Sequence, residues 1–134
     1  MATTTNGSTM KLEVVMLPVA DVDRARDFYA ERVGFNLDHD VQPGNGMRVV
    51  QLTPPGSGCS IVMGTGMVQL DEMAPGSIRG LHLVVPDVRA LREALIGRGV
   101  EVSEVVEFDR GIKVATFSDP DGNSWVLQEV PPGV

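Results

Sequence analysis

The chain has 134 residues, of which 43% are hydrophobic, a mean hydropathy of +0.05, and a formal net charge of −7 from 11 basic and 18 acidic side chains. This composition excludes a disordered chain, and the scattered basic residues exclude a patch that would bind nucleic acid or an anionic membrane. The single cysteine, Cys59, excludes an internal disulfide, and no apolar run approaches the roughly 20 residues of a membrane helix. We therefore expect a cytoplasmic globular protein with no nucleic-acid or membrane partner.

Residues 1–10 (MATTTNGSTM) are expected to form a flexible N-terminal tail, because they have neither the basic start nor the apolar centre of a signal peptide. Residues 11–134 are expected to fold as a single domain. Its elements fall into a first module over residues 11–64, a linker over 65–77 and a second module over 78–130. The linker is rich in glycine and methionine, and it is long enough to cover a site as well as to join the modules.

The first module is predicted to begin with a valine-rich strand over residues 12–19 and to continue into a helix over about 22–32. Asp21 is placed to cap the start of this helix, and Gly34 is placed to end it in a left-handed conformation. Strands are then predicted over residues 35–39, 47–53 and 59–63, with turn sequences at 43–46 and 54–56.

The second module repeats this order. Residues 85–88 match 19–22 at a shift of 66 positions, and residues 112–118 match 47–53 at a shift of 65. The pattern predicts a strand over 80–85, a helix over about 88–98 between a cap at Asp87 and Gly99, and strands over 100–107, 112–117 and 124–129. Two matched segments at nearly the same shift indicate a duplicated βαβββ unit.

The doubled βαβββ order, with residues 17–29 (LPVADVDRARDFY) and 117–128 (FSDPDGNSWVLQ), resembles the vicinal oxygen chelate superfamily. This superfamily contains glyoxalase I, bleomycin-resistance proteins, fosfomycin-resistance enzymes, extradiol dioxygenases and methylmalonyl-CoA epimerase. The resemblance covers nearly all of residues 11–130. It implies an α+β fold in which two modules curl a mixed sheet into a cup, with helices outside and the ligand inside, and it implies a homodimer. The resemblance does not identify one activity, because members of the superfamily catalyse different reactions on the same fold.

The resemblance also implies four metal-ligand positions: a histidine that opens the first strand of each module and a glutamate on each last strand. In this sequence these positions hold Val14, Gly80, Ile61 and Val126. None of these residues has a side-chain lone pair to donate to a metal ion. We therefore expect no metal and no other cofactor, and this departure puts the metal-dependent reactions of the superfamily in doubt for this chain.

Alternation along the strands predicts which side chains line the cup, because residues two apart share one face of a strand. The resulting inner face is mostly apolar, contains several methionines and has a few polar groups. It comprises Val14, Met16, Met47, Val49, Gln51, Cys59, Ile61, Met63, His82, Val84, Val114, Thr116, Ser124, Val126 and Gln128. Such a lining is typical of a site for a flat or apolar organic molecule.

His82 is the candidate catalytic residue, because an imidazole on the inner face can act as a general base or orient a ligand carbonyl. The alternative is a hydrogen-bonded histidine in a polar corner of the core. His39, between Asp38 and Asp40, is expected on a solvated rim, although these three residues are also possible metal ligands. Cys59 is expected to be a small core thiol, because no basic neighbour in the sequence would lower its pKa.

Three hypotheses remain open from the sequence. The favoured one is a metal-free protein that binds a small apolar or aromatic organic molecule in its cup, for sequestration of a drug or metabolite. The second is a cofactor-independent isomerase, cyclase or lyase that uses His82. The third is a glyoxalase- or dioxygenase-type metalloenzyme with atypical ligands such as His82 and His39. Whether the chain is an enzyme, and whether the cup forms within one chain or across two, also stays open.

Overall fold

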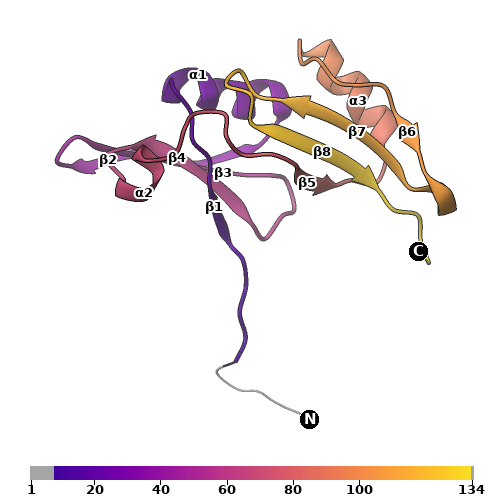
Figure 1. Cartoon of the computed structure of the whole chain (residues 1–134), viewed down its shortest axis with the longest axis horizontal. Coiled ribbons are helices and arrows are strands. Elements are labelled where there is room, and N and C mark those ends of the chain that lie inside the picture. The colour runs from indigo at the N-terminus through magenta and orange to yellow at the C-terminus, as the bar shows by residue number, and fades with distance from the viewer. Residues whose placement is uncertain (1–7, 134) are drawn as a thin grey trace.

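The structure is a computed structural model that describes residues 8–133. Two βαβββ modules follow one another along the chain (Figure 1). The first contains β1 (Val14–Met16), α1 (Val22–Asp27) and its π-helical continuation η1 (Phe28–Val33), β2 (Asn36–Gly44), β3 (Met47–Thr53) and β4 (Ser60–Thr65). The short helix α2 (Val68–Asp71) leads to the second, which contains β5 (Leu81–Val84), α3 (Val88–Gly97), β6 (Val106–Glu107), the 3-10 turn η2 (Asp109–Gly111), β7 (Lys113–Ser118) and β8 (Ser124–Glu129).

Each module forms a four-stranded mixed sheet with the same topology. The strand orders are β1-β4-β3-β2 and β5-β8-β7-β6. In each sheet the first strand runs parallel to the last one, and the remaining pairs are antiparallel. The repeated order confirms the predicted fold class, an α+β protein made of two βαβββ modules.

The helices begin and end where the predicted capping residues lie. The Asp21 carboxylate accepts a hydrogen bond from the amide of Arg24 at 3.1 Å, and that of Asp87 accepts one from the amide of Ala90 at 3.0 Å. Gly34 ends η1 with a φ of 96°, which a residue with a side chain rarely adopts. Local chemistry therefore sets these boundaries.

Three strands differ clearly in extent from the prediction. β1 covers only Val14–Met16 of the strand expected over residues 12–19. β2 continues to Gly44 instead of ending near residue 39, because Asn45 and Gly46 both take positive φ values and close a two-residue hairpin to β3. The strand expected over 100–107 is reduced to β6 and an isolated bridge between Val102 and Phe117. Of the expected N-terminal tail, residues 8–10 belong to a stretch that extends away from both sheets, and residues 1–7 lie outside the described residues (Figure 1).

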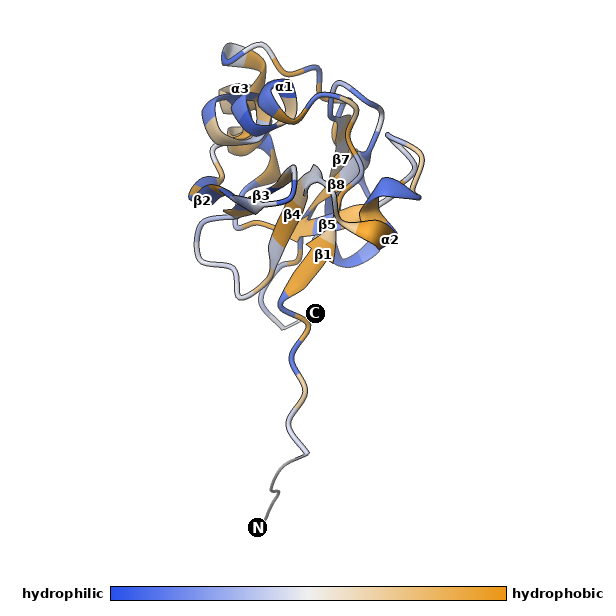
Figure 2. Ribbon diagram, turned by 90° about the vertical axis from the view of Figure 1, so that its left-hand side faces the viewer, coloured by the Kyte–Doolittle hydropathy of each residue, from blue (hydrophilic) through white to orange (hydrophobic). Residues whose placement is uncertain are grey.

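One hydrophobic core serves both sheets. Leu52 and Met63 of the first sheet and Phe117 and Leu127 of the second sheet belong to the same cluster of buried side chains. Figures 1 and 2 show α1 and α3 together on one side of the two sheets. Because both sheets turn their helix-facing side toward this shared core, the opposite face of each sheet points outward. No helix in the described part of the chain is long and apolar enough to cross a membrane.

A buried polar network joins the two modules within this core. The Tyr29 hydroxyl donates a hydrogen bond to Asp119 at 2.8 Å and accepts one from the Trp125 indole N–H at 2.8 Å. The buried amide of Asn123 donates to Asp119 at 2.8 Å and to the Pro18 carbonyl at 2.9 Å. Burial, followed by the charge of Asp119, raises the pKa of Tyr29 far above its ordinary value, so the hydroxyl stays a donor.

An ion network on the surface fastens α1 to the first sheet. The Asp40 carboxylate accepts two hydrogen bonds from Arg48, at 3.0 and 2.8 Å, and one from Arg26 of α1 at 2.8 Å. The guanidinium of Arg48, followed by that of Arg26, lowers the pKa of Asp40 from 3.8 to about 2. Asp23 and Asp27 bring further carboxylates to the two arginines.

Acidification should destabilise the protein through Asp40. A carboxyl group whose pKa is depressed by folding stabilises the folded state above its unfolded pKa, and this contribution is lost as the pH falls through the folded pKa. Between about pH 5 and pH 2, the wild type should lose about 1 kcal/mol more stability than Asp40→Asn, a value reduced for the partial exposure of the pair. Urea unfolding followed by circular dichroism at several pH values measures this difference. If the stability of both proteins falls equally with pH, Asp40 does not stabilise the folded state through its lowered pKa.

Candidate functional site

The inner face of the second sheet carries the residues that alternation predicts. Leu83, Phe117 and Leu127 lie in the shared core, so their neighbours along β5, β7 and β8 lie on the opposite face. Direct pairing of β8 with β5 and β7 brings these neighbours together: His82, Val84, Val114, Thr116, Ser124, Val126 and Gln128. Val84 is 71% exposed, so this face is open to solvent.

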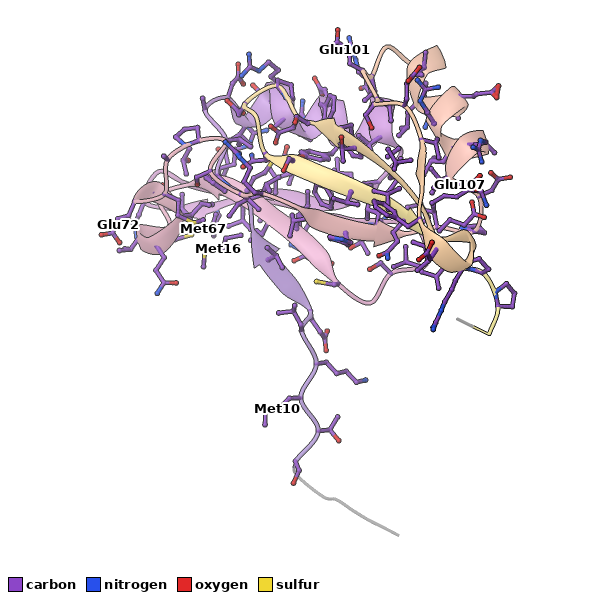
Figure 3. The ribbon with its side chains drawn as sticks, turned by 45° about the vertical axis from the view of Figure 1, so that its right-hand side comes forward. Met10, Met16, Met67, Glu72, Glu101 and Glu107 are labelled. Atoms are coloured by element: carbon purple, nitrogen blue, oxygen red, sulfur yellow. The ribbon has the colours of Figure 1, made fainter. Side chains whose placement is uncertain are left out.

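The first sheet has an equivalent inner face. Met16 of β1 and Gln51 of β3 both lie beside Val62 of β4, and Met47 and Val49 share the face of Gln51 along β3. Val14, two residues before Met16, is 47% exposed on the same face. Figure 1 shows that α2 lies on the side of this sheet opposite to α1, and Figure 3 places Met16 and Met67 on that side. The glycine- and methionine-rich linker therefore covers part of the first inner face.

The expected orientation of Cys59, Ile61 and Met63 is wrong. Ile61 pairs with Leu52 and Met63 with Val50, and all four side chains are buried in the shared core. Cys59 precedes β4 and lies half-buried on the same side as Ile61, where it lines a small cavity with it. These three residues therefore do not line the inner face.

The error comes from the length of one loop. Leu52 faces Ile61 across the β3–β4 hairpin, and the equivalent pair across the β7–β8 hairpin is Phe117 and Trp125, so the first loop is one residue longer. A shift of one residue moves every side chain of a strand to its other face. The inner face of β4 therefore carries Ser60 and Val62, whose counterparts in β8 are Ser124 and Val126.

The positions where the resemblance implies metal ligands do not fit a metal ion. Val14, Gly80 and Val126 lie on the inner faces and offer no donor atom, while Ile61 points into the core. Within residues 8–133, no group of three or more His, Cys, Asp or Glu side chains is placed to hold a metal ion. Neither a histidine nor a carboxylate replaces the missing ligands at these four positions.

A polar cluster on the first inner face was not predicted. The Asp38 carboxylate accepts hydrogen bonds from Thr53, from Gln51 at 3.4 Å and from Asn36 at 2.8 Å. The Ser60 hydroxyl lies 2.6 Å from that of Thr53 and extends the cluster onto β4. The hydrogen bond from Thr53, more than those from the other donors, lowers the pKa of Asp38, so the carboxylate is ionised at neutral pH.

A β-bulge explains why alternation could not find this cluster. The pairing of β2 with β3 slips between Leu37, which lies opposite Leu52, and His39, which lies opposite Gln51. The extra residue, Asp38, is thereby turned toward the inner-face side chains of β3. His39 lies on the rim of the same face and is exposed. Bulges carry no reliable mark in a single sequence.

His82 is exposed on the second inner face, and its ring orientation is defined. The Nδ1 atom lies 2.7 Å from the carbonyl oxygen of Gly80, which can only accept a hydrogen bond. Nδ1 therefore carries the proton, and in the neutral ring Nε2 is left as an acceptor. The amide of Gly80 in turn donates to the Ser124 hydroxyl at 2.9 Å. The exposed Nε2 of His82 thus takes no part in the hydrogen bond to Gly80.

A separate cavity of about 780 Å³ lies beside β5, between the two modules. Leu91 and Leu95 of α3, Phe35 and residues 54–57 of the β3–β4 loop line it, and His82 and Val84 lie at its edge. Its walls belong mainly to the helix-facing side of the fold. It is therefore distinct from the two inner faces.

Two consecutive βαβββ modules, each with one open sheet face, are typical of one class of protein. The profile of the Glyoxalase/Bleomycin resistance protein/Dioxygenase superfamily matches residues 11–127. This chain belongs to that superfamily, as the sequence resemblance predicts. Among curated proteins, none matches the chain significantly.

Three solved structures are similar to this chain over most of its length. TnmS3, an antibiotic binding protein from Streptomyces sp. CB03234, is 38% identical over 94% of this chain and 100% of its own, with a TM-score of 0.81. A glyoxalase/bleomycin resistance protein from the same strain is 41% identical over 87% of this chain and 98% of its own, with a TM-score of 0.74. A superfamily member from Sphaerobacter thermophilus DSM 20745 is 30% identical over 90% and 98%, with a TM-score of 0.77.

Proposed function

We propose that this protein binds a flat, largely apolar or aromatic organic molecule against its inner faces without using a metal ion. The observation that carries the proposal is the absence of donor side chains at the expected metal-ligand positions: Val14, Gly80 and Val126 lie on mostly apolar inner faces, and Ile61 is buried in the core. Hydrocarbon and thioether side chains favour a ligand through buried apolar area and adaptable shape. The similarity to TnmS3, described as an antibiotic binding protein, supports sequestration of a drug or metabolite.

The polar groups of the two faces would orient this ligand. The cluster around Asp38 offers an ionised carboxylate and hydroxyl groups on the first face, and His82 offers Nε2 on the second face. A ligand with hydroxyl or amine donors at its ends would satisfy both faces while its ring system packs on the apolar residues between them. Net charge of −7 further favours cationic ligands over anionic ones.

A homodimer would complete the cup. Each sheet turns its inner face away from the shared core, so the two inner faces of one chain do not enclose a common space. Val14 at 47% and Val84 at 71% exposure lie on these open faces, in the edge strands β1 and β5. Pairing of the first inner face of one copy with the second inner face of another would bury both and form two identical cups by twofold symmetry.

A cofactor-independent enzyme is the second candidate function, and the free Nε2 of His82 favours it. On the inner face this nitrogen could accept a proton from a bound substrate, as a general base does. A His82→Ala variant separates the two functions. For a binding protein it should change affinity only modestly, whereas for an enzyme it should remove turnover.

Calorimetric titration of chelator-treated protein tests the proposed function. The probes are quinizarin, a neutral planar anthraquinone, and doxorubicin, a planar cation. We expect saturable binding with a dissociation constant on the order of 1 µM or tighter, unchanged by EDTA or by added zinc. Elemental analysis of protein purified without chelator gives the control, with no stoichiometric transition metal expected. Absence of binding by both probes, or binding only after metal is added, would contradict the proposal.

A further inference from the structure

Phe108 is set apart from the other aromatic residues of the chain. The sequence contains four Phe, one Tyr and one Trp. Five of these six rings form one cluster with centroid distances of 5.2 to 6.4 Å, in which Phe28 is half-buried and the other four are buried: Phe28, Tyr29, Phe35, Phe117 and Trp125. The sixth, Phe108, is 58% exposed just beyond β6. The Phe108 ring lies outside this cluster and keeps more than half of its surface available for contact with another molecule.

The backbone fixes the face on which Phe108 lies. Glu107 forms a salt bridge with Arg89 of α3 at 3.3 Å, so its side chain lies on the helix-facing side, as Figure 3 shows. Val106, its neighbour, pairs with Val114 of the inner face. Phe108 has extended dihedral angles, φ −108° and ψ 179°, so the alternation continues and its ring belongs to the inner side with Val106.

The hairpin that carries Phe108 is held in place by its own contacts. The Phe108 amide donates to the carbonyl of Ile112 at 2.8 Å, which closes the hairpin around η2. Arg110 and Gly111 both take positive φ values, 65° and 75°, to make the turn. Gly111 lies close to Pro131, where an added Cβ would stand 3.0 Å from the proline ring. Phe108 is therefore a positioned ring at the rim of the second inner face.

We propose that Phe108 is a specificity-determining residue that stacks on the planar ring system of the bound ligand. The inference rests on the proposed function and adds to it that the ligand is aromatic, not merely apolar. Val106 and Val114 would form the floor beneath the ligand, and the Phe108 ring its side wall. Aromatic pairs gain from offset or edge-to-face contacts beyond the area that they bury, so the preference falls on flat conjugated rings.

Three substitutions and a control test this role with quinizarin as the probe. Phe108→Ala should weaken binding roughly 10- to 50-fold, Phe108→Leu should give an intermediate loss, and Phe108→Trp should stay within about 3-fold of the wild type. Leu37→Ala is the control, because Leu37 is a similarly exposed apolar residue that pairs with Leu52 on the helix-facing side. In proton NMR spectra, the upfield ring-current shift of the quinizarin protons should decrease in Phe108→Ala at saturation.

The outcomes separate the inference from the proposed function. If the wild type binds quinizarin and Phe108→Ala binds it within 2-fold with unchanged ring-current shifts, the stacking role is wrong and the proposed function stands. If Phe108→Ala instead changes the molar mass measured by light scattering, the ring belongs to a contact between copies of the chain, and the stacking role is wrong as well. If the wild type binds neither quinizarin nor doxorubicin, both proposals fall.

Discussion

Replacing Asp119 with alanine should lower the free energy of unfolding by roughly 3–5 kcal/mol. Asp119 is 5% exposed, and its carboxylate accepts four hydrogen bonds: from the Tyr29 hydroxyl, the Asp121 amide and the amide and side chain of Asn123. Removing the carboxylate leaves the Tyr29 and Asn123 donors buried without this acceptor. Because Tyr29 belongs to the first module and Asp119 to the second, the loss should weaken the junction between them.

Urea unfolding monitored by tryptophan fluorescence measures this effect, since Trp125 donates to Tyr29 in the same network. Tyr29→Phe removes a single hydroxyl and should cost less, about 1–2 kcal/mol. Asp109→Ala is the control, because Asp109 is an exposed carboxylate in η2 and its removal should cost below about 0.5 kcal/mol. A loss smaller than about 1 kcal/mol in Asp119→Ala would show that the network does not hold the modules together.

An arginine at Val126 should weaken quinizarin binding by at least about 100-fold. Val126 lies at the centre of the second inner face, directly beside His82 in β5 and Thr116 in β7. A guanidinium there would occupy the space of the ligand and would have to be desolvated when an apolar ring binds. Val49→Arg should have the same effect on the first inner face, where Val49 pairs with Val41 and Gly64.

Both variants should remain folded, because the inner faces lie outside the shared core. Ile96→Arg is the matched control, since Ile96 is an exposed apolar residue on α3 and an arginine there should leave the affinity unchanged. Calorimetry gives the affinities, and thermal unfolding confirms that the variants are folded. If Val126→Arg is folded and still binds quinizarin like the wild type, the ligand does not bind on the second inner face. The cavity of about 780 Å³ beside β5 is then the next candidate site.

Much of the fold could be predicted because the helix caps and the hydrophobic patterns of single segments agree with the repeated βαβββ order. Asp21 and Asp87 each start a helix, and β3 and β8 have the predicted bounds, because short-range chemistry and alternating hydrophobicity determine them. The duplication reinforced these signals, since each module supported the interpretation of the other. The inner face of the second sheet follows from the same alternation.

The inner face of the first sheet was harder to predict, because one extra residue in a loop or strand moves the side chains that follow it to the opposite face. The loop before Ser60 is one residue longer than its counterpart in the second module, so the alternation expected along this strand placed Ile61 and Met63 on the wrong face. The bulge at Asp38 follows from the pairing of β2 with β3 and not from any local motif. No pattern in the sequence distinguishes Phe108, because the clustering of the other five rings depends on the tertiary structure.

Mixing the two arginine variants tests most directly whether two copies of the chain form the cup. The Val49→Arg and Val126→Arg proteins are purified separately, and each alone is expected not to bind quinizarin. Equal amounts are then unfolded together and refolded. If the cup joins the first face of one copy to the second face of another, mixed dimers contain one cup with both substitutions and one with neither. The mixture should then regain about a quarter of the wild-type quinizarin sites at wild-type affinity. If dimers form and no sites return, each cup lies within a single chain, and a cup shared between two copies is ruled out.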